Sequence, residues 1–290
     1  MRVIRAEILG LCFGVRDALR VISAVSAPER TTILGELVHN PLVLAEIGRI
    51  GFRSAAERDR ERVPQTPNVL ITAHGISDRR RASLQAAGKR LIDTTCPLVS
   101  RVHQVAQRLA RDGYHILLIG HAGHVEVEGI VEDLESFDVI STPEDVTTYS
   151  QVKLGVISQS TTPETLADEV RRAAVALNPQ ADIRYVDTIC HPTKEHQRAL
   201  DRLLDQVSNV VVVGGRNSNN TRELVRRCRE RDAMVQHVES ASEIDRTWFD
   251  GMETVGLTAG TSTLDATIDE VHEVLSGIES TPRLLRRGGF

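Results

Sequence analysis

Three cysteines of this 290-residue chain each stand at the head of a similar stretch, so the sequence reads as one unit written three times. Cys12, Cys96 and Cys190 are each followed by apolar positions at helical spacing, which predicts that each cysteine begins a helix. A polar turn residue lies 27 positions after the cysteine in the first copy and 28 positions after it in the other two. This repetition suggests three domains that converge on one metal.

Each copy also contains two short apolar runs that end in small or polar residues. The first runs cover residues 31–40, 115–124 and 209–220, and the second cover 68–75, 154–161 and 255–262. Helices that alternate with such runs predict three small α/β domains with parallel sheets, whose functional loops lie at the carboxyl ends of the strands. We expect domains over 1–95, 96–188 and 189–276, followed by a tail over 277–290.

Composition narrows the class of protein. With 41% hydrophobic residues the chain can bury a sizeable core, and no run approaches the roughly 18 apolar residues of a membrane-spanning helix. The first residues lack the apolar core of a signal peptide, so we expect a cytoplasmic protein with no membrane partner. The net charge is −5 and the basic residues are dispersed, which argues against a nucleic-acid partner.

The repeated cysteines are better explained by metal binding than by packing. Cytosolic disulfides are rare, and the spacing fits no paired CxxC zinc pattern. Cys228 has no counterpart in the other copies and is expected to be a buried packing residue. A helix N-terminus lowers the pKa of a thiol, and soft thiolates select zinc or iron–sulfur clusters. Three cysteines on a four-iron cluster would leave one iron open as a Lewis acid.

Six turns that precede helices carry hydroxyl, amide and imidazole donors. These turns cover residues 38–40, 73–75, 120–126, 158–161, 216–221 and 258–262. Exposed backbone N–H groups at helix starts bind anions, and partly protonated His39, His74 and His124 add positive charge. The turns hold few Lys or Arg residues, so one phosphorylated ligand shared among the three domains explains them best.

Glu126 is the candidate proton donor. It lies two residues after His124 on a strand-to-helix turn, where a carboxyl can deliver a proton to a leaving hydroxyl. Glu128 is expected to be an exposed helix residue. His103 and His121 are interpreted as structural.

The turns and helix starts contain the motifs Leu-Cys-Phe-Gly-Val-Arg-Asp-Ala, Val-His-Asn, Ala-His-Gly, Asp-Thr-Thr-Cys-Pro-Leu-Val, Gly-His-Ala-Gly-His-Val-Glu-Val-Glu-Gly, Asp-Thr-Ile-Cys and Asn-Ser-Asn-Asn-Thr-Arg-Glu-Leu. In this order and over nearly the whole chain, they resemble the LytB family of 4-hydroxy-3-methylbut-2-enyl diphosphate reductases. The resemblance implies a cloverleaf of three α/β domains around a central [4Fe-4S] cluster. It also implies a two-electron, two-proton removal of an allylic hydroxyl, which ends the methylerythritol phosphate route with isopentenyl and dimethylallyl diphosphate.

The resemblance also assigns roles to residues. Cys12, Cys96 and Cys190 match the cluster ligands, and Glu126 matches the residue that orders the substrate hydroxyl and relays protons. The diphosphate site would be formed by His39, His74, His124, Ser160, Thr161, Ser218, Asn219, Asn220 and Ser262. The electrons would come from a donor such as ferredoxin or flavodoxin.

The chain departs from the family pattern near these residues, at Val125, Ser160, Asn219, Leu264 and the His-Pro-Thr that follows Cys190. The cysteines and Glu126 are untouched, so the reaction type is firmer than the substrate. Two alternatives stay open: a redox-neutral hydro-lyase, or a paralogue acting on a related phosphorylated substrate. A cluster-bearing sensor without catalysis is disfavoured by the acid and the anion site.

Overall fold

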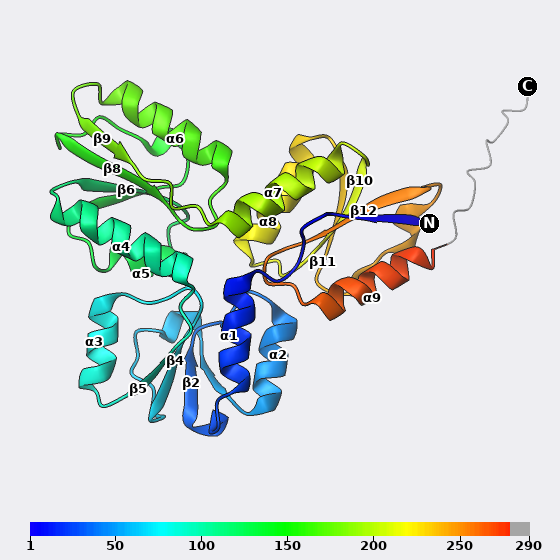
Figure 1. Cartoon of the computed structure of the whole chain (residues 1–290), viewed down its shortest axis with the longest axis horizontal. Coiled ribbons are helices and arrows are strands. Elements are labelled where there is room, and N and C mark those ends of the chain that lie inside the picture. Colours follow the sequence, from blue (N-terminus) through cyan, green and yellow to red (C-terminus); the bar gives the residue numbers. More distant parts are fainter. Residues whose placement is uncertain (279–290) are drawn as a thin grey trace, which may run out of the picture. The chain divides into compact units, whose positions relative to one another are not determined.

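The computed structural model describes residues 1–278 and contains three four-stranded sheets in which every pair of neighbouring strands is parallel (Figure 1). The first sheet has the order β1 (Arg2–Arg5), β12 (Thr254–Ala259), β10 (Asn209–Val213), β11 (Met234–Val238). The second has the order β3 (Arg53–Ala55), β2 (Thr31–Leu34), β4 (Asn68–Ile71), β5 (Arg90–Asp93). The third has the order β7 (Phe137–Ile140), β6 (His115–Ile119), β8 (Lys153–Ser158), β9 (Asp182–Tyr185). The predicted α/β class with three parallel sheets is confirmed.

Nine α-helices accompany these strands within the described residues. They are α1 (Phe13–Ser23), α2 (Pro41–Ile50), α3 (Asp78–Ala86), α4 (Pro97–Arg111), α5 (Val125–Val131), α6 (Glu164–Leu177), α7 (His191–Leu204), α8 (Asn219–Glu230) and α9 (Asp265–Ser276). Among residues 1–278, none of the helices has the length and apolar character needed to cross a membrane. Most of the predicted tail 277–290 lies outside the described residues.

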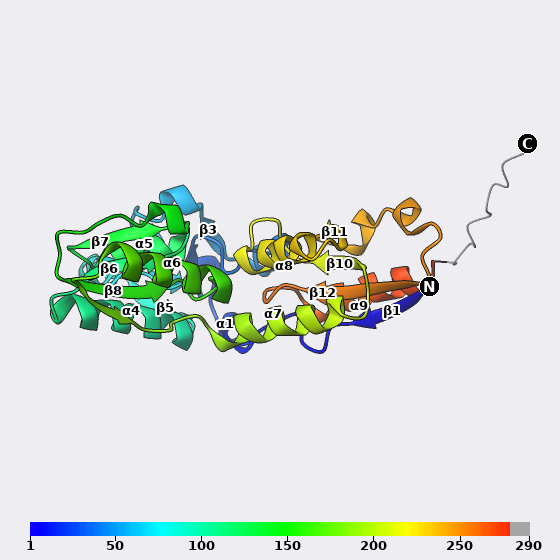
Figure 2. The same ribbon diagram turned by 90° about the horizontal axis from the view of Figure 1, so that it is seen from above.

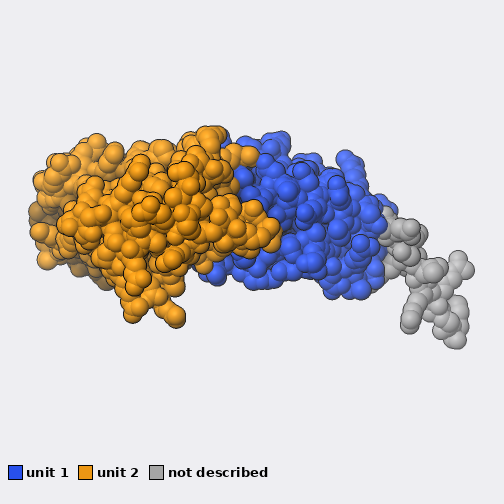
Figure 3. Space-filling view, turned by 90° about the horizontal axis from the view of Figure 1, so that it is seen from below, with its two compact units in different colours: residues 1–11, 39–41, 195–290 blue, residues 12–38, 42–194 orange. Residues whose placement is uncertain are grey.

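The described chain divides into two compact units, which Figure 3 colours separately. The first unit comprises residues 1–11, 39–41 and those from 195 onward, and it contains the sheet with β10 and β12. The second unit comprises residues 12–38 and 42–194 and contains the other two sheets. All three repeated cysteines therefore belong to the second unit.

Buried apolar residues on both faces of the central strands hold each sheet between helices. In β6, Ile116 and Leu118 pack with α4 and α5, whereas Leu117 and Ile119 pack with α6 on the opposite face. The same alternation places Val210 and Val212 of β10 with α7 and α8, and Val211 and Val213 with α9. Each such buried side chain stabilises the fold by roughly 1.5–3 kcal/mol relative to an exposed one. Strands covered on both faces read as continuous apolar runs, which is why the sequence revealed them.

Five of the six edge strands carry charged residues, and none of the six was predicted. The sequence predicted two strands in each copy, and these are the central pairs β2 and β4, β6 and β8, and β10 and β12. The outer strand β9 (Asp-Ile-Arg-Tyr) alternates exposed with half-buried residues, and β5 (Arg-Leu-Ile-Asp) has exposed residues at both ends and half-buried residues between them. Charged side chains at a sheet edge discourage pairing with other chains. They also interrupt the apolar pattern by which a strand is predicted from the sequence.

The start of the chain differs from the predicted domain range 1–95. Residues Arg2–Arg5 form β1, which pairs with β12 in register Arg2 to Thr254 and so joins the two ends of the described chain (Figure 2). The first eleven residues consequently lie with residues from 195 onward. A four-residue strand with two arginines is too short and too polar for the sequence to indicate which strand it pairs with.

Candidate functional site

Each repeated cysteine lies where the chain leaves an edge strand and enters a helix. Cys12 follows β1 and is the N-cap of α1, Cys96 follows β5 and is the N-cap of α4, and Cys190 follows β9 and directly precedes α7. The predicted positions at helix starts are confirmed. Because each of these helices leads from one sheet to the next, the three thiols occupy equivalent points of the repeat.

The three thiols of the second unit influence one another. A Cβ atom on Gly14 would lie 2.6 Å from Cys96 Sγ, so only glycine at this position admits the sulfur against the first turn of α1. The charge of Cys12 acts on both Cys96 and Cys190. Backbone N–H groups fix the other two cysteines, since Cys96 N–H donates to Ala73 O and Cys190 N–H donates to Ser160 O.

The expectation that a helix N-terminus lowers the pKa of these thiols is wrong for the metal-free protein. Burial raises the pKa of Cys12 and Cys96, and it raises the pKa of Cys190 to about 12. The backbone N–H groups at the helix starts act in the opposite direction, but desolvation of the thiolate is the larger effect. A cation bound at the sulfurs would reverse this balance.

The donor set suits an iron–sulfur cluster better than a single ion. Among residues 1–278, no three His, Cys, Asp or Glu side chains converge as the ligands of one metal ion do. The thiolates of a cluster bind different irons, so they need not meet at one point. Cys12, Cys96 and Cys190 are half-buried free thiols, as such ligands require.

Glu126 is buried in the second unit, and each oxygen of its carboxyl accepts a hydrogen bond. The side chain is only 1% exposed. Oε1 accepts the Ser160 backbone N–H at 2.7 Å, and Oε2 accepts the Ser160 hydroxyl at 2.8 Å. Burial raises the pKa of Glu126 to about 7, although both bonds from Ser160 lower it. Since Ser160 also accepts the N–H of Cys190, one residue links the carboxyl to a proposed metal ligand.

His124 caps the helix that carries Glu126. Its Nδ1 accepts the Glu126 backbone N–H at 3.1 Å, so the neutral ring carries its hydrogen on Nε2, where it can donate to an anion. The His74 ring meets the His124 ring edge to face, with centroids 5.7 Å apart. Two predicted substrate ligands from different sheets thus lie together in the second unit.

The first unit gathers the other predicted donors at the ends of β10 and β12. Asn220 Oδ1 accepts the Thr261 N–H at 3.0 Å, and Ser218 caps α8 by accepting the Thr221 N–H. Asn220 Nδ2 and Ser262 Oγ are buried and make no hydrogen bond within the described part of the chain. The backbone carbonyl of His39 approaches Gly215 so closely that a Cβ there would lie 2.2 Å away. Two orphaned donors at two helix starts form a suitable cradle for an anion.

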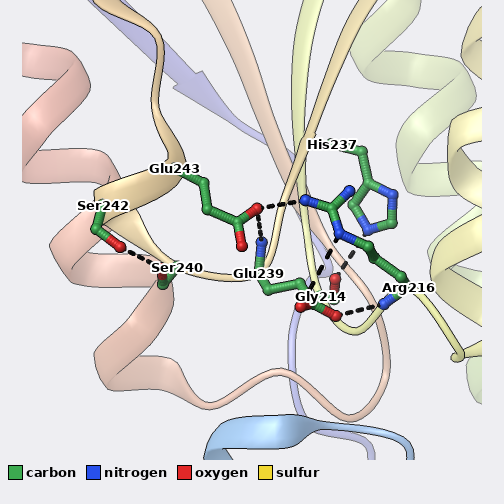
Figure 4. Close-up of polar contacts among 7 residues, drawn as sticks. All are labelled: Gly214, Arg216, His237, Glu239, Ser240, Ser242 and Glu243. Atoms are coloured by element: carbon green, nitrogen blue, oxygen red, sulfur yellow. Dashed lines mark hydrogen bonds and ion pairs between the residues drawn. The ribbon is translucent and has the colours of Figure 1, made fainter.

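Carboxylates hold the turn that precedes Ser218 and occupy its arginine (Figure 4). The backbone N–H of Arg216 donates to Glu239 at 2.7 Å, and its guanidinium donates to Glu243 at 2.6 Å. His237 Nε2 donates to Gly214 O at 2.8 Å. Arg216 is therefore bound to its neighbours, and the turn offers neutral donors in a fixed conformation.

Sequence reasoning placed two buried amides within the predicted donor turns but gave neither a role of its own. Asn40 Nδ2 donates to Ser262 O at 2.8 Å and thereby fixes the segment after His39; its only signal was its place beside that histidine. Gln159 is 1% exposed, and its Nε2 has no hydrogen-bond partner among residues 1–278. Gln159 directly precedes Ser160, but a glutamine at a strand end carries no distinctive pattern.

The remaining predicted residues differ in burial and in whether their side chains form hydrogen bonds. Thr161 Oγ1 is buried without a hydrogen-bond partner in the described chain, as expected of a binding residue. Asn219 Oδ1 instead accepts from Arg222 at 2.7 Å. Glu128 is exposed and accepts the Gly123 N–H, and Cys228 is fully buried in the core, so both structural interpretations are confirmed.

A family model and individual known proteins match nearly the whole of this chain. The family model described as LytB protein matches residues 3–276. A 4-hydroxy-3-methylbut-2-enyl diphosphate reductase of Pelobacter propionicus is 35% identical, with 93% of this chain and 96% of that protein covered. One from Aquifex aeolicus is 32% identical, with 93% and 94% covered.

Two solved structures share the fold. An (E)-4-hydroxy-3-methyl-but-2-enyl diphosphate reductase, described as the terminal enzyme of the non-mevalonate pathway, aligns with a TM-score of 0.68 at 29% identity, covering 96% of this chain and 100% of that one. The E-1-hydroxy-2-methyl-but-2-enyl-4-diphosphate reductase of Plasmodium falciparum aligns with a TM-score of 0.86 at 24% identity, covering 95% and 88%. The second likeness bears on the fold alone.

Proposed function

Because this chain belongs to the LytB family, we propose that it is a 4-hydroxy-3-methylbut-2-enyl diphosphate reductase. The allylic alcohol, two electrons and two protons would give isopentenyl or dimethylallyl diphosphate and one water. The observation that carries the proposal is the grouping, within one unit, of three equivalent thiols and a buried carboxyl whose charge acts on two of them.

We propose that Cys12, Cys96 and Cys190 hold one [4Fe-4S] cluster with an open iron. When bound, such a cluster supplies electrons and a Lewis-acidic iron. The electrons would come from a small donor protein such as ferredoxin or flavodoxin.

Proton delivery is assigned to Glu126. A carboxyl with a pKa of about 7 is substantially protonated near neutral pH and can give its proton to a leaving hydroxyl. Ser160 holds both carboxyl oxygens and so fixes the direction of transfer. This bond needs only a hydroxyl, which Ser160 supplies.

Diphosphate binding is assigned to the donors of the strand-end turns. In the first unit these are His39, Ser218, Asn220 and Ser262, and in the second they are His74, His124 and Thr161. Bonds to the remote diphosphate turn binding energy into orientation of the reacting hydroxyl. We infer that Asn219 and Ser160 act indirectly, because their side chains bind Arg222 and Glu126.

The proposal is tested by anaerobic reconstitution with iron and sulfide, followed by assay with 4-hydroxy-3-methylbut-2-enyl diphosphate and a dithionite–mediator pair. We expect both C5 diphosphates, formed only when the reductant is present. Turnover without a reductant would identify a hydro-lyase instead. Consumption of only a different phosphorylated alcohol would identify a paralogue with another substrate.

A further inference from the structure

Thr193, in the first turn of α7, makes a hydrogen bond with the sulfur of one proposed cluster ligand. Its Oγ1 lies 3.0 Å from Cys190 Sγ, and the threonine is fully buried. In the metal-free protein either atom can be the donor. A thiolate that ligates a metal has no hydrogen to donate, so the Thr193 hydroxyl is the donor once the sulfur is a ligand.

The other two copies of the repeat have valine where this copy has the threonine. The residue three positions after the repeated cysteine is Val15 in the first copy, Val99 in the second and Thr193 in the third. All three residues are buried. Valine has nearly the same shape as threonine but cannot donate a hydrogen bond, so packing alone does not require a hydroxyl at this position.

The residue two positions after each cysteine accounts for the difference. It is Gly14 in the first copy, Leu98 in the second and Pro192 in the third. Burial raises the pKa of the thiols in the first two copies; against it, the backbone N–H groups of Gly14 and Leu98 lower the pKa of the thiol in their own copy, without forming a capping hydrogen bond. Proline has no backbone N–H, so the third sulfur lacks this donor. The Thr193 hydroxyl, which bonds Cys190 Sγ, can replace it.

We propose that Thr193 is a positioning residue, whose hydroxyl gives the Cys190 thiolate the hydrogen bond that Pro192 cannot supply; this rests on the proposed function. A hydrogen bond to a ligating sulfur stabilises the reduced, more negative form of an iron–sulfur cluster and therefore raises its reduction potential. The hydroxyl keeps the third ligand similar to the other two, although its helix start has one N–H fewer.

A redox titration of the reconstituted holoenzyme tests the proposal, with the electron paramagnetic resonance signal of the reduced cluster as the readout and no substrate present. We expect Thr193→Val to lower the equilibrium constant for one-electron reduction about tenfold, which is about 59 mV, because a hydrogen bond to a charged group is lost. Thr193→Ser keeps the hydroxyl and should keep the potential of the parent. Thr32→Val is the matched control, since Thr32 is also buried in the second unit but its hydroxyl bonds Thr66. Its potential should equal that of the parent.

Pro192→Ala restores the missing N–H and makes the test specific for hydrogen bonding. In the Thr193→Val background it should return most of the lost potential, because the new N–H replaces the lost hydroxyl. In the parent background it should raise the potential, since Cys190 then has both donors. The second result does not depend on Thr193→Val, so it tests the proposal even if that variant binds less iron.

Three results would each overturn the proposal. These are an unchanged potential in Thr193→Val, an equal loss in Thr193→Ser, and an unchanged potential when Pro192→Ala is made in the parent. Iron analysis of the parent reports separately on the proposed function. A parent that binds no cluster would overturn both proposals, whereas a cluster whose potential does not respond to these variants would overturn only the role of Thr193.

Discussion

The candidate acid of the second unit and two candidate phosphate ligands of the first unit are held in opposite ways. In the second unit, the Glu126 carboxyl accepts hydrogen bonds from Ser160 on both oxygens, and burial favours the neutral forms of the thiols and of this acid by raising their pKa values. In the first unit, Asn220 Nδ2 and Ser262 Oγ are buried with no hydrogen bond inside the described chain.

This contrast separates chemistry from binding. A proton donor must be held in one geometry before the substrate arrives, so its partners belong to the protein. A buried donor without a partner costs stability until a ligand accepts its hydrogen bond. In the proposed site, the orphaned donors Asn220 and Ser262 would therefore store part of the binding energy as unsatisfied groups, whereas the hydrogen-bonded pair of Glu126 and Ser160 would store orientation.

The largest expected effect is the loss of the metal site. Replacing Cys12, Cys96 or Cys190 by serine should abolish both iron binding and turnover, because thiolates are the ligands that hold an iron–sulfur cluster. Iron analysis after anaerobic reconstitution is the measurement. Cys228→Ser, in the core of the first unit, is the control and should bind as much iron as the parent. A single-cysteine variant with full iron content would refute the shared-ligand assignment.

Next in size is the acid itself. Glu126→Gln should keep the cluster and the binding of the product diphosphate, yet lower kcat by about 10²- to 10⁴-fold, since an amide cannot deliver the proton. Steady-state kinetics with dithionite and mediator measure this. Glu128→Gln is the neighbouring control and should be nearly silent, because Glu128 is exposed and bound to the Gly123 N–H. If Glu128→Gln abolished turnover instead, the acid would have been assigned to the wrong side of that helix turn.

The sequence predicted the parts of this fold that are both repeated and buried. Continuous apolar runs revealed β6, β8 and β10, and the matched cysteines revealed the starts of α1, α4 and α7. The edge strands were not predicted because they are short and only partly buried, so they do not form continuous apolar runs. The pairing of β1 with β12 escaped because residues 2–5 and 254–259 meet only through the folded chain.

The candidate site, like the fold, could be predicted from the sequence only in part. Motifs predicted Glu126 and His124, but the bond from Ser160 to Glu126 joins residues 34 positions apart and needs the third sheet to form. Burial, which no local pattern reports, reversed the expected pKa shift of the thiols. Asn40 and Gln159 were given no role of their own because an amide acquires its role only from the atoms around it.

The raised pKa of Glu126 predicts that the free energy of unfolding of the metal-free protein depends on pH. The folded protein holds this proton up to about pH 7, whereas the unfolded chain releases it near 4.5. Between these values the folded state binds more protons, so its free energy of unfolding falls as pH rises. The difference amounts to roughly 3 kcal/mol in total at 1.36 kcal/mol per pKa unit. Glu126→Gln should lack this fall. Urea unfolding of both proteins at pH 5 and pH 8 measures it, and parallel pH dependences would contradict a buried neutral carboxyl.

The smallest effect tests the contrast between the units most directly, through two serines. Ser262→Ala removes an orphaned hydroxyl, so the metal-free protein should lose no stability, while affinity for isopentenyl diphosphate falls about tenfold, as expected for a hydrogen bond to a charged group. Ser160→Ala removes a hydroxyl that donates to Glu126, so stability should fall by about 1 kcal/mol while affinity changes little. Urea unfolding and calorimetric titration of both variants give the four values. If Ser262→Ala destabilised the protein and left the affinity unchanged, its hydroxyl would be a structural group, and the stored binding energy would have to lie with other orphaned donors such as Asn220 and Thr161.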